Sequence, residues 1–303
     1  MKEEARIADP QSSLMAEHYA GGIPVATAMP IGAPSAPRLP PQSLRSFSLP
    51  PPPGDPSLEG AVREFLTANT WPEGLQEYFL RRLRTDAATY FIVDDSGSMS
   101  ISDATRFVKH GTKMVPVTCS RYAELQDCIT FHASLANTSK HPTTFRLLNN
   151  APPIVIGGPA DDGSGYGRLL QALELSPGGG TPLCQHIREV VAEIASMASA
   201  LRADGRKVTL VITTDGEAND GSLAEAMEPL KDLPVWVVLR LCTDEAAVVD
   251  YWAGIDQVLE LNIDVLDDLG SEAAEVRKVN PWLLYGEPLH RLREVSVLRA
   301  TIS

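Results

Sequence analysis

The chain has 303 residues, of which 44% are apolar, enough for one large domain with a substantial core and flanking segments. Its formal net charge of −13 at pH 7 argues against binding nucleic acid or an anionic membrane through general electrostatics. No apolar run reaches the roughly 18 residues that a membrane span needs, and no apolar segment follows the charged N-terminus. We therefore expect a cytoplasmic protein, and four cysteines without CxxC spacing are expected to be free thiols.

Residues 1–56 are predicted to form a disordered, proline-rich tail. Prolines are dense between residues 21 and 56, and each one lacks a backbone donor and forces its predecessor into an extended conformation. Neither a helix nor a sheet propagates through such a segment. The run Leu49–Pro53 fits a plain spacer, which we favour, or a ligand for the proline-reading domain of a partner.

Two short helices are predicted over residues 57–85, packed on the edge of the main domain. Val62, Phe65 and Leu66 have helical spacing in the first, and a second apolar face follows Pro72. Trp71, between the two helices, is expected to be a core anchor.

Between residues 86 and 262, apolar strand-like runs alternate with helical patterns, which predicts one α/β domain. Continuously apolar runs such as Tyr90–Val93 are typical of strands buried on both faces. We expect a Rossmann-like, doubly wound, mostly parallel sheet with helices on both faces and one antiparallel edge strand. The predicted strands cover residues 90–93, 144–148, 154–156, 208–213, 235–239 and 258–261, and the predicted helices cover residues 122–134, 166–175, 181–201, 223–228 and 246–253.

Residues 263–303 are predicted to form a helical C-terminal extension with turn breakers. The apolar run Pro281–Tyr285 is expected to pack onto the domain, and the alternative is an anchor for a partner.

Oxygen-bearing side chains lie on three loops that are predicted to meet at one edge of the sheet. Asp94, Ser96 and Ser98 lie directly after the first strand, at the edge where open α/β sheets bind ligands. Thr181 follows a run of three glycines, and Asp215 follows the strand at 208–213. Oxygen ligands without thiolate or imidazole favour Mg²⁺, with Mn²⁺ or Ca²⁺ as alternatives. The sequence therefore predicts a metal site at this edge.

This combination resembles the von Willebrand factor type A (VWA, or integrin I-like) domain with a complete metal-ion-dependent adhesion site. That family's pattern is D-x-S-x-S, then a threonine about 70–90 residues on, then an aspartate in a T-D-G turn. The matching positions are Asp94, Ser96, Ser98, Thr181 and Asp215, and the resemblance covers residues 86–262.

The resemblance implies a binding module and not an enzyme. Ser96 and Ser98 would bind Mg²⁺ directly, Asp94 and Asp215 would supply charge directly or through water, and Thr181 would enter or leave as its glycine-rich loop moves. Because the ligands include neutral hydroxyls, the ion would keep positive charge and accept an Asp or Glu carboxylate from a partner protein. Asp95, Glu217 and Asp220 are expected at the same face in supporting roles: loop hydrogen bonds, turns or outer-shell charge.

Two other functions remain open. Phosphohydrolases that use Mg²⁺ also place an acidic loop at a strand end, but their D-x-D pattern is replaced here by Ser96 at the third position. The second alternative is that the domain is the VWA subunit of a larger ubiquitin-ligase or chelatase-like complex.

Overall fold

The computed structural model describes residues 56–110, 113–243, 245–259 and 263–296. The proline-rich run and the rest of the predicted tail before Pro56 lie outside these residues. None of the described helices is both long enough and apolar enough to cross a membrane.

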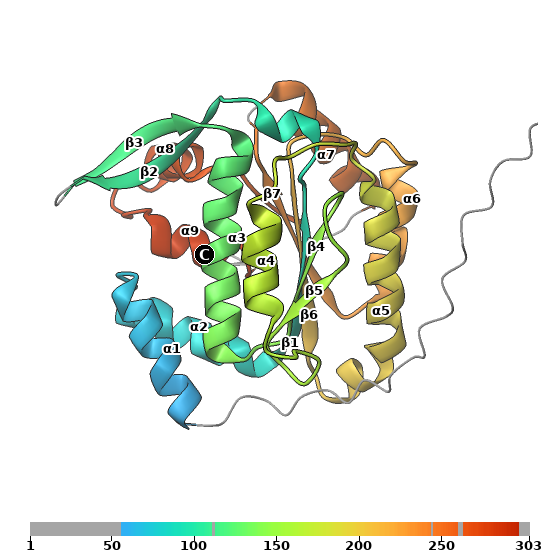
Figure 1. The fold of residues 1–303 in the computed structure, drawn as a ribbon, viewed down its shortest axis with the longest axis horizontal. Helices are drawn as coiled ribbons and strands as arrows, with labels where there is room; N and C mark the ends of the chain where they lie inside the picture. Colours follow the sequence, from blue (N-terminus) through green and yellow to red (C-terminus); the bar gives the residue numbers. More distant parts are fainter. Residues whose placement is uncertain (1–55, 111–112, 244, 260–262, 297–303) are drawn as a thin grey trace, which may run out of the picture. The chain divides into compact units, whose positions relative to one another are not determined.

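A six-stranded sheet forms the centre of the domain (Figure 1). Its strand order is β5-β4-β1-β6-β7-β8, and every neighbouring pair is parallel except β4 and β5 at one edge. The predicted α/β fold with a mostly parallel sheet and one antiparallel edge strand is confirmed. The strands are β1 (Asp86–Val93), β4 (Thr143–Leu147), β5 (Ile154–Ile156), β6 (Lys207–Thr214), β7 (Val235–Leu241) and β8 (Ile263–Leu266).

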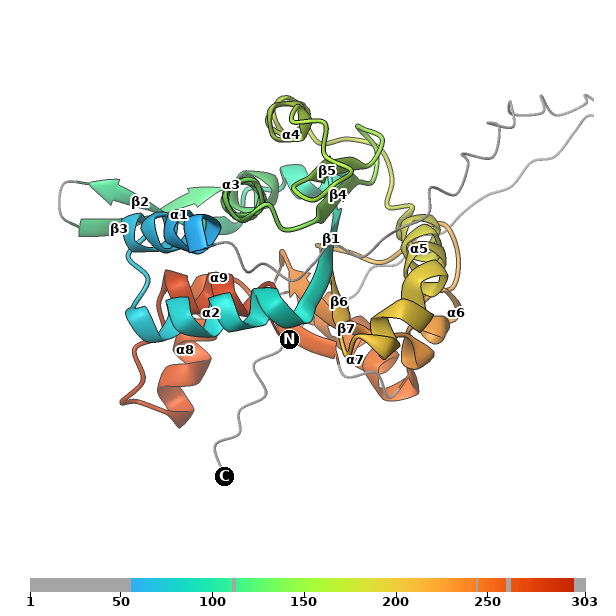
Figure 2. The same cartoon turned by 90° about the horizontal axis from the view of Figure 1, so that it is seen from below.

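Helices cover both faces of this sheet (Figure 2). One face packs against α1 (Pro56–Ala68), α2 (Glu73–Thr85), α3 (Arg121–Ser139), α4 (Gly165–Leu173) and the C-terminal α9 (Glu287–Arg293). The other face packs against α5 (Leu183–Ala203), α6 (Leu223–Met227) and α7 (Ala246–Leu259). Short 3-10 turns lie at Gly97–Ser100 and Glu228–Asp232, and α8 (Leu269–Val279) follows β8.

Strand β1 shows why its sequence is apolar without alternation. Phe91 and Val93 belong to the core on the α3 side, whereas Tyr90 and Ile92 belong to the core on the α5 side. Successive side chains of a strand point to opposite faces, so a strand covered on both faces buries every residue. Trp71 is buried in the core on the α3 side, as predicted.

Three features differ from the sequence-based expectations. The last strand, predicted at 258–261, is wrong: Leu259 still belongs to α7, and the sixth strand is β8. A separate antiparallel hairpin of β2 (Ala104–His110) and β3 (Lys113–Cys119) was not predicted. In the run 281–285, Tyr285 is buried, but Trp282 is 71% and Leu284 91% exposed, so the predicted packing holds for only part of it.

The sheet order places a switch point between its two central strands. The chain leaves β1 through α3 toward β4 on one side, and later returns through α5 to β6 on the other side of β1. The loops that follow β1 and β6 therefore diverge at their carboxyl ends, where open α/β sheets form their ligand crevice.

Candidate metal site

The loop after β1 begins with a buried carboxylate, Asp94. Its backbone N–H donates to the carbonyl of Thr213 at 3.0 Å, which continues the pairing of β1 with β6. One carboxylate oxygen accepts from the N–H of Ser96 at 2.9 Å, and the other accepts from the Thr214 hydroxyl at 2.7 Å. Burial raises the pKa of Asp94, although these hydrogen bonds oppose the shift. Asp94 is therefore a buried carboxyl group held in place beneath the loop and not an exposed group.

Three oxygen atoms that could bind a metal come together beside Asp94: the hydroxyl oxygens of Ser96 and Ser98, and Oδ1 of Asp215. The hydroxyl oxygens of Ser96 and Ser98 lie 3.1 Å apart. The Ser98 hydroxyl donates to Oδ1 of Asp215, on the loop after β6, at 2.8 Å. Ser96 and Asp215 are buried, whereas Ser98 is exposed. Residues 117 positions apart in the chain thus form one polar cluster that opens to solvent through Ser98.

Thr181 reaches the same edge on the third loop. Gly178 donates its N–H to the carbonyl of Asp95 at 2.7 Å, and Gly97 donates to the carbonyl of Gly179 at 3.3 Å. The carbonyl of Thr181 accepts from the N–H of Asn219, in the loop after β6, at 3.0 Å. Backbone hydrogen bonds therefore join all three predicted loops.

The glycine run allows these loops to approach closely. Gly179 has φ of +88°, and a side chain there would bring its Cβ to 2.4 Å from Oδ1 of Asn149. The amide of Asn149 in turn donates to the carbonyl of Gly180 at 2.9 Å. Loop movement stays a prediction, but close packing is a sufficient reason for glycine at these positions.

The three supporting acids hold different places. Oδ1 of Asp95 accepts from the N–H and the side-chain amide of Asn149 at 2.8 and 3.1 Å. Its Oδ2 is buried and has no hydrogen-bond partner within the part of the chain that the structure describes. Burial raises the pKa of Asp95. Asp220 accepts from the N–H groups of Cys184 and Gln185 at 3.0 and 2.8 Å, so it caps the start of α5. Glu217 is exposed.

Arg121, at the start of α3, is a member of the site that the sequence did not indicate. Its guanidinium donates to Oδ2 of Asp215 at 3.1 Å, to Asp103 at 2.5 and 2.8 Å, and to Glu245 at 2.6 Å. Hydrogen bonding to Asp103 raises the pKa of Arg121, so the guanidinium stays charged. Because it occupies one oxygen of Asp215, only Oδ1 of that carboxylate is turned toward Ser98.

The donor set fits a small hard cation. Neighbouring ligands of an octahedral Mg²⁺, with metal–oxygen distances of about 2.0–2.1 Å, lie about 3 Å apart. The Ser96–Ser98 and Ser98–Asp215 separations of 3.1 and 2.8 Å are of this size. Of the carboxyl groups of Asp94, Asp95 and Asp215, that of Asp215 pairs with the guanidinium of Arg121. The same guanidinium also pairs with Asp103 and Glu245, so carboxyl groups outnumber the cation at this edge.

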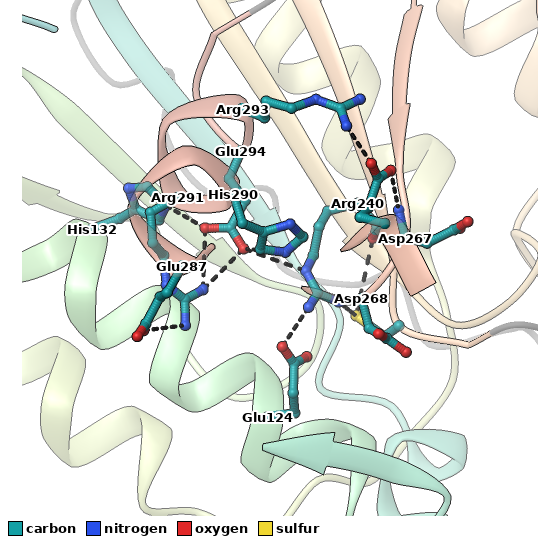
Figure 3. A network of polar contacts seen from close by, with 12 residues as sticks. Glu124, His132, Arg240, Asp267, Asp268, Glu287, His290, Arg291, Arg293 and Glu294 are labelled. Carbon is teal, nitrogen blue, oxygen red and sulfur yellow. Dashed lines mark hydrogen bonds and ion pairs between the residues drawn. The ribbon is translucent and has the colours of Figure 1, made fainter. Parts of the chain in front are cut away.

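A second polar cluster lies behind α3, where α9 packs (Figure 3). Cys128, His132 and Glu294 place one potential ligand atom each within 4.8 Å of one another, and all three are buried. Glu294 already has partners, however: His132 at 2.8 Å, Arg291 at 2.9 and 3.1 Å, and Arg240 at 3.6 Å. Two guanidinium groups so close would repel a cation. Burial also keeps the pKa of the Cys128 thiol well above its usual value, which disfavours the thiolate that binds metals.

This cluster is a buried ionic network. Arg240, near the carboxyl end of β7, pairs with Glu124 of α3 as well as with Glu294, and it is fully buried. Burial alone would raise the pKa of Glu294, but Arg291 and the hydrogen bond from His132 hold it well below its usual range. Burial lowers the pKa of His290 to about 3, so its imidazole is neutral. The sequence carried no signal for the pairs that Arg240 forms, because Glu124 and Glu294 lie 116 and 54 positions away in the chain.

Comparisons with known proteins give little beyond the fold. No known family profile and no curated protein matches this chain. Among solved structures, the conserved hypothetical protein BatB from Bacteroides thetaiotaomicron is similar at 13% identity, with a TM-score of 0.39, over 64% of this chain and 97% of that one. The VWA domain of SpRpn10 is similar at 13% identity, with a TM-score of 0.35, over 59% of this chain and 87% of that one. Neither likeness supports an assignment of function, and the fold class rests on the topology of this chain.

Proposed function

We propose that this chain is a Mg²⁺-dependent protein-binding module whose metal site captures an acidic side chain of a partner. The observation that carries the proposal is the set of oxygen donors at the switch point, with Ser96, Ser98 and Asp215 at the spacing of octahedral ligands. Mn²⁺ or Ca²⁺ would occupy the same oxygen site with different coordination numbers.

Each residue has a role that its contacts support. Ser96, Ser98 and Oδ1 of Asp215 would hold the ion, and Thr181 would complete the rim from the loop that packs beside them. Asp94, which accepts a hydrogen bond from the Thr214 hydroxyl, would supply buried negative charge beneath the ion. A bound Mg²⁺ supplies a Lewis-acidic position that a carboxylate fills. The exposed hydroxyl of Ser98 marks the side from which that carboxylate would approach.

The burial of Asp94 supports binding over phosphoryl transfer. A nucleophilic aspartate must reach a phosphorus atom, whereas both oxygens of Asp94 are engaged and the side chain is inaccessible. Turnover of p-nitrophenyl phosphate that requires Mg²⁺ and disappears in Asp94→Ala would contradict this proposal.

We further propose that the module works in the cytoplasm as an adaptor, alone or as a subunit of a larger complex. The cysteines Cys119, Cys128, Cys184 and Cys242 are all free thiols, which fits that location.

A random peptide display library panned on the immobilised full chain tests the proposal. In Mg²⁺ buffer, the enriched peptides should contain Asp or Glu at a common position, and EDTA should release them. Replacement of that residue by Asn or Gln should remove binding. Enrichment that survives EDTA, or that selects no acidic residue, would contradict capture by the metal.

A further inference from the structure

The β2–β3 hairpin stands apart from the central sheet. It connects the loop that carries Ser96 and Ser98 to α3, and it forms a two-stranded sheet of its own that projects from the domain (Figure 1). Phe107, Val108, Val115 and Val117 on it are each 37–42% exposed. Isolated ribbons are marginal in water, and exposed strand edges with apolar side chains are templates for a further strand.

The two edges of this ribbon are not equivalent. Pro116 lies opposite Phe107 in the register, and a proline has no N–H to give to a ladder. This pair must therefore be one of the non-hydrogen-bonded pairs of the antiparallel ladder. It follows that the backbone groups of Thr105 and Phe107 point away from β3, to the free edge of β2. The outer edge of β3 is interrupted by Pro116, whereas the edge of β2 keeps its donors and acceptors.

The free edge of β2 borders a cavity of about 350 Å³. Thr105 and Phe107 line it on one side. Phe65 of α1 and Phe131 of α3 line it with ring centroids 5.5 Å apart. Arg291 of α9 is almost fully buried in its wall, and its Nε has no hydrogen-bond partner among the described residues. Both views place the hairpin on the same side of the sheet as α1, α3 and α9 (Figures 1 and 2). The cavity offers room for the side chains of an added strand.

The hairpin differs in charge from the rest of the chain. Residues 104–119 contain three basic residues, Arg106, Lys109 and Lys113, and no acidic one, although the whole chain has a formal charge of −13. Arg106 lies 3.9 Å from Asp127, and Glu124 and Glu287 also line the cavity. The positive charge complementary to an acidic occupant is therefore that of Lys109 and Lys113.

We propose that the free edge of β2 binds an extended, acidic segment of a partner protein as a third strand. Main-chain hydrogen bonds to Thr105 and Phe107 would fix the segment, and apolar side chains at alternate positions would enter the cavity. The net positive charge of the hairpin would attract the acidic residues of the segment. The interaction needs no metal, so it is separate from the proposed metal-dependent capture at the neighbouring loop.

The test is fluorescence anisotropy on the full chain with a labelled peptide of about nine alternating valine and glutamate residues, a normal strand length. The decisive variant is Phe107→Pro, which removes an outward N–H and leaves the ladder to β3 intact. Its matched control is Phe107→Val, which removes the ring but keeps the N–H. Binding should weaken by roughly tenfold or more in Phe107→Pro and by no more than about threefold in Phe107→Val. Circular dichroism of each variant verifies the fold.

The charge of the hairpin is tested in the same assay. The double variant Lys109→Glu/Lys113→Glu should weaken binding, whereas Arg277→Glu/Lys278→Glu, an equal charge change on α8, should not. EDTA should leave binding unchanged, which separates this proposal from the metal-dependent one. Equal binding of a peptide with lysine in place of glutamate, or an unaffected Phe107→Pro, would overturn the proposal. Two other results would also overturn the proposal. One is a concentration-dependent dimer of this chain that Phe107→Pro abolishes, and the other is sedimentation with phosphatidylserine vesicles that Phe107→Pro abolishes.

Discussion

The candidate metal site and the buried network behind α9 both gather charged side chains, but they differ in how far these groups satisfy one another. In the network, Glu124 and Glu294 meet Arg240, and Glu294 also meets Arg291. At the metal site, the carboxyl groups of Asp94, Asp95 and Asp215 outnumber the one guanidinium, that of Arg121. A cluster with as many guanidinium groups as carboxylates is typical of a structural role, whereas an excess of carboxyl groups points to a cationic ligand.

The largest expected effect lies in the network. Glu294→Ala would leave Arg240 and Arg291 buried without their shared carboxylate, which should lower the free energy of unfolding by about 3–5 kcal/mol. The control is Glu287→Ala, because Glu287 is 51% exposed and lies 3.6 Å from Arg291, so it should cost less than about 1 kcal/mol. Urea unfolding measures both. A loss below about 1 kcal/mol in Glu294→Ala would mean that the network does not stabilise the docking of α9.

The next effect concerns the metal site. Asp215→Asn should weaken Mn²⁺ binding by roughly 100-fold or more, since even groups outside the first coordination shell typically contribute 10–100-fold. Isothermal titration calorimetry gives the affinity. Glu294→Gln should leave that affinity unchanged, so the two regions separate into one that binds and one that stabilises. Equal Mn²⁺ affinity in wild type and Asp215→Asn would remove Asp215 from the ligands.

The network should also make stability depend on pH. His290 contacts Tyr285 and Glu294 and lies near Arg240, Arg291 and Arg293, and burial lowers its pKa to about 3. The unfolded state therefore binds a proton more readily, and stability is lost as pH falls below about 6.5 toward 3. Between pH 7 and 5.5 wild type should lose about 1 kcal/mol more than His290→Gln. Identical pH profiles would show that His290 titrates normally in the folded protein.

The smallest effect tests the supporting acids. Asp220→Ala removes the side chain that accepts from the N–H groups of Cys184 and Gln185, which should cost about 0.5–1 kcal/mol of stability. It should not change Mn²⁺ affinity, and neither should Glu217→Ala. A large drop in affinity in either variant would place that carboxylate among the metal ligands.

Much of this molecule follows from local sequence patterns. Continuous apolar runs predicted the strands of the parallel sheet, because burial on both faces removes the alternation. The positions of Asp94 and Asp215 after two strands predicted that their loops would meet, because the carboxyl ends of parallel strands lie at one edge. Thr181 was added to this edge by the resemblance to the VWA pattern. The hydrogen-bonded contact between these loops in the structure fits that prediction, while the metal itself stays a prediction.

Ion pairs between residues far apart in the chain, and strands that lie at the edge of a sheet, were not predictable in this way. Arg240 lies in a strand and meets carboxylates 116 and 54 positions away, Glu124 and Glu294, which no spacing rule connects. The β2–β3 hairpin contains Pro116, which argues against a strand unless its edge position is known. The last strand was misplaced because Val258 and Leu259 continue the helix α7, and short apolar runs fit a helix or a strand equally well.

The most direct test of the central claim is an NMR titration with Mn²⁺, which broadens the amide signals nearest the bound ion. Broadening should begin at residues 94–98, 178–181 and 213–217, on the three loops at the switch point, and Mg²⁺ in excess should reverse it. Broadening centred on Cys128, His132 and Glu294, or no localised broadening, would contradict a metal site at these loops.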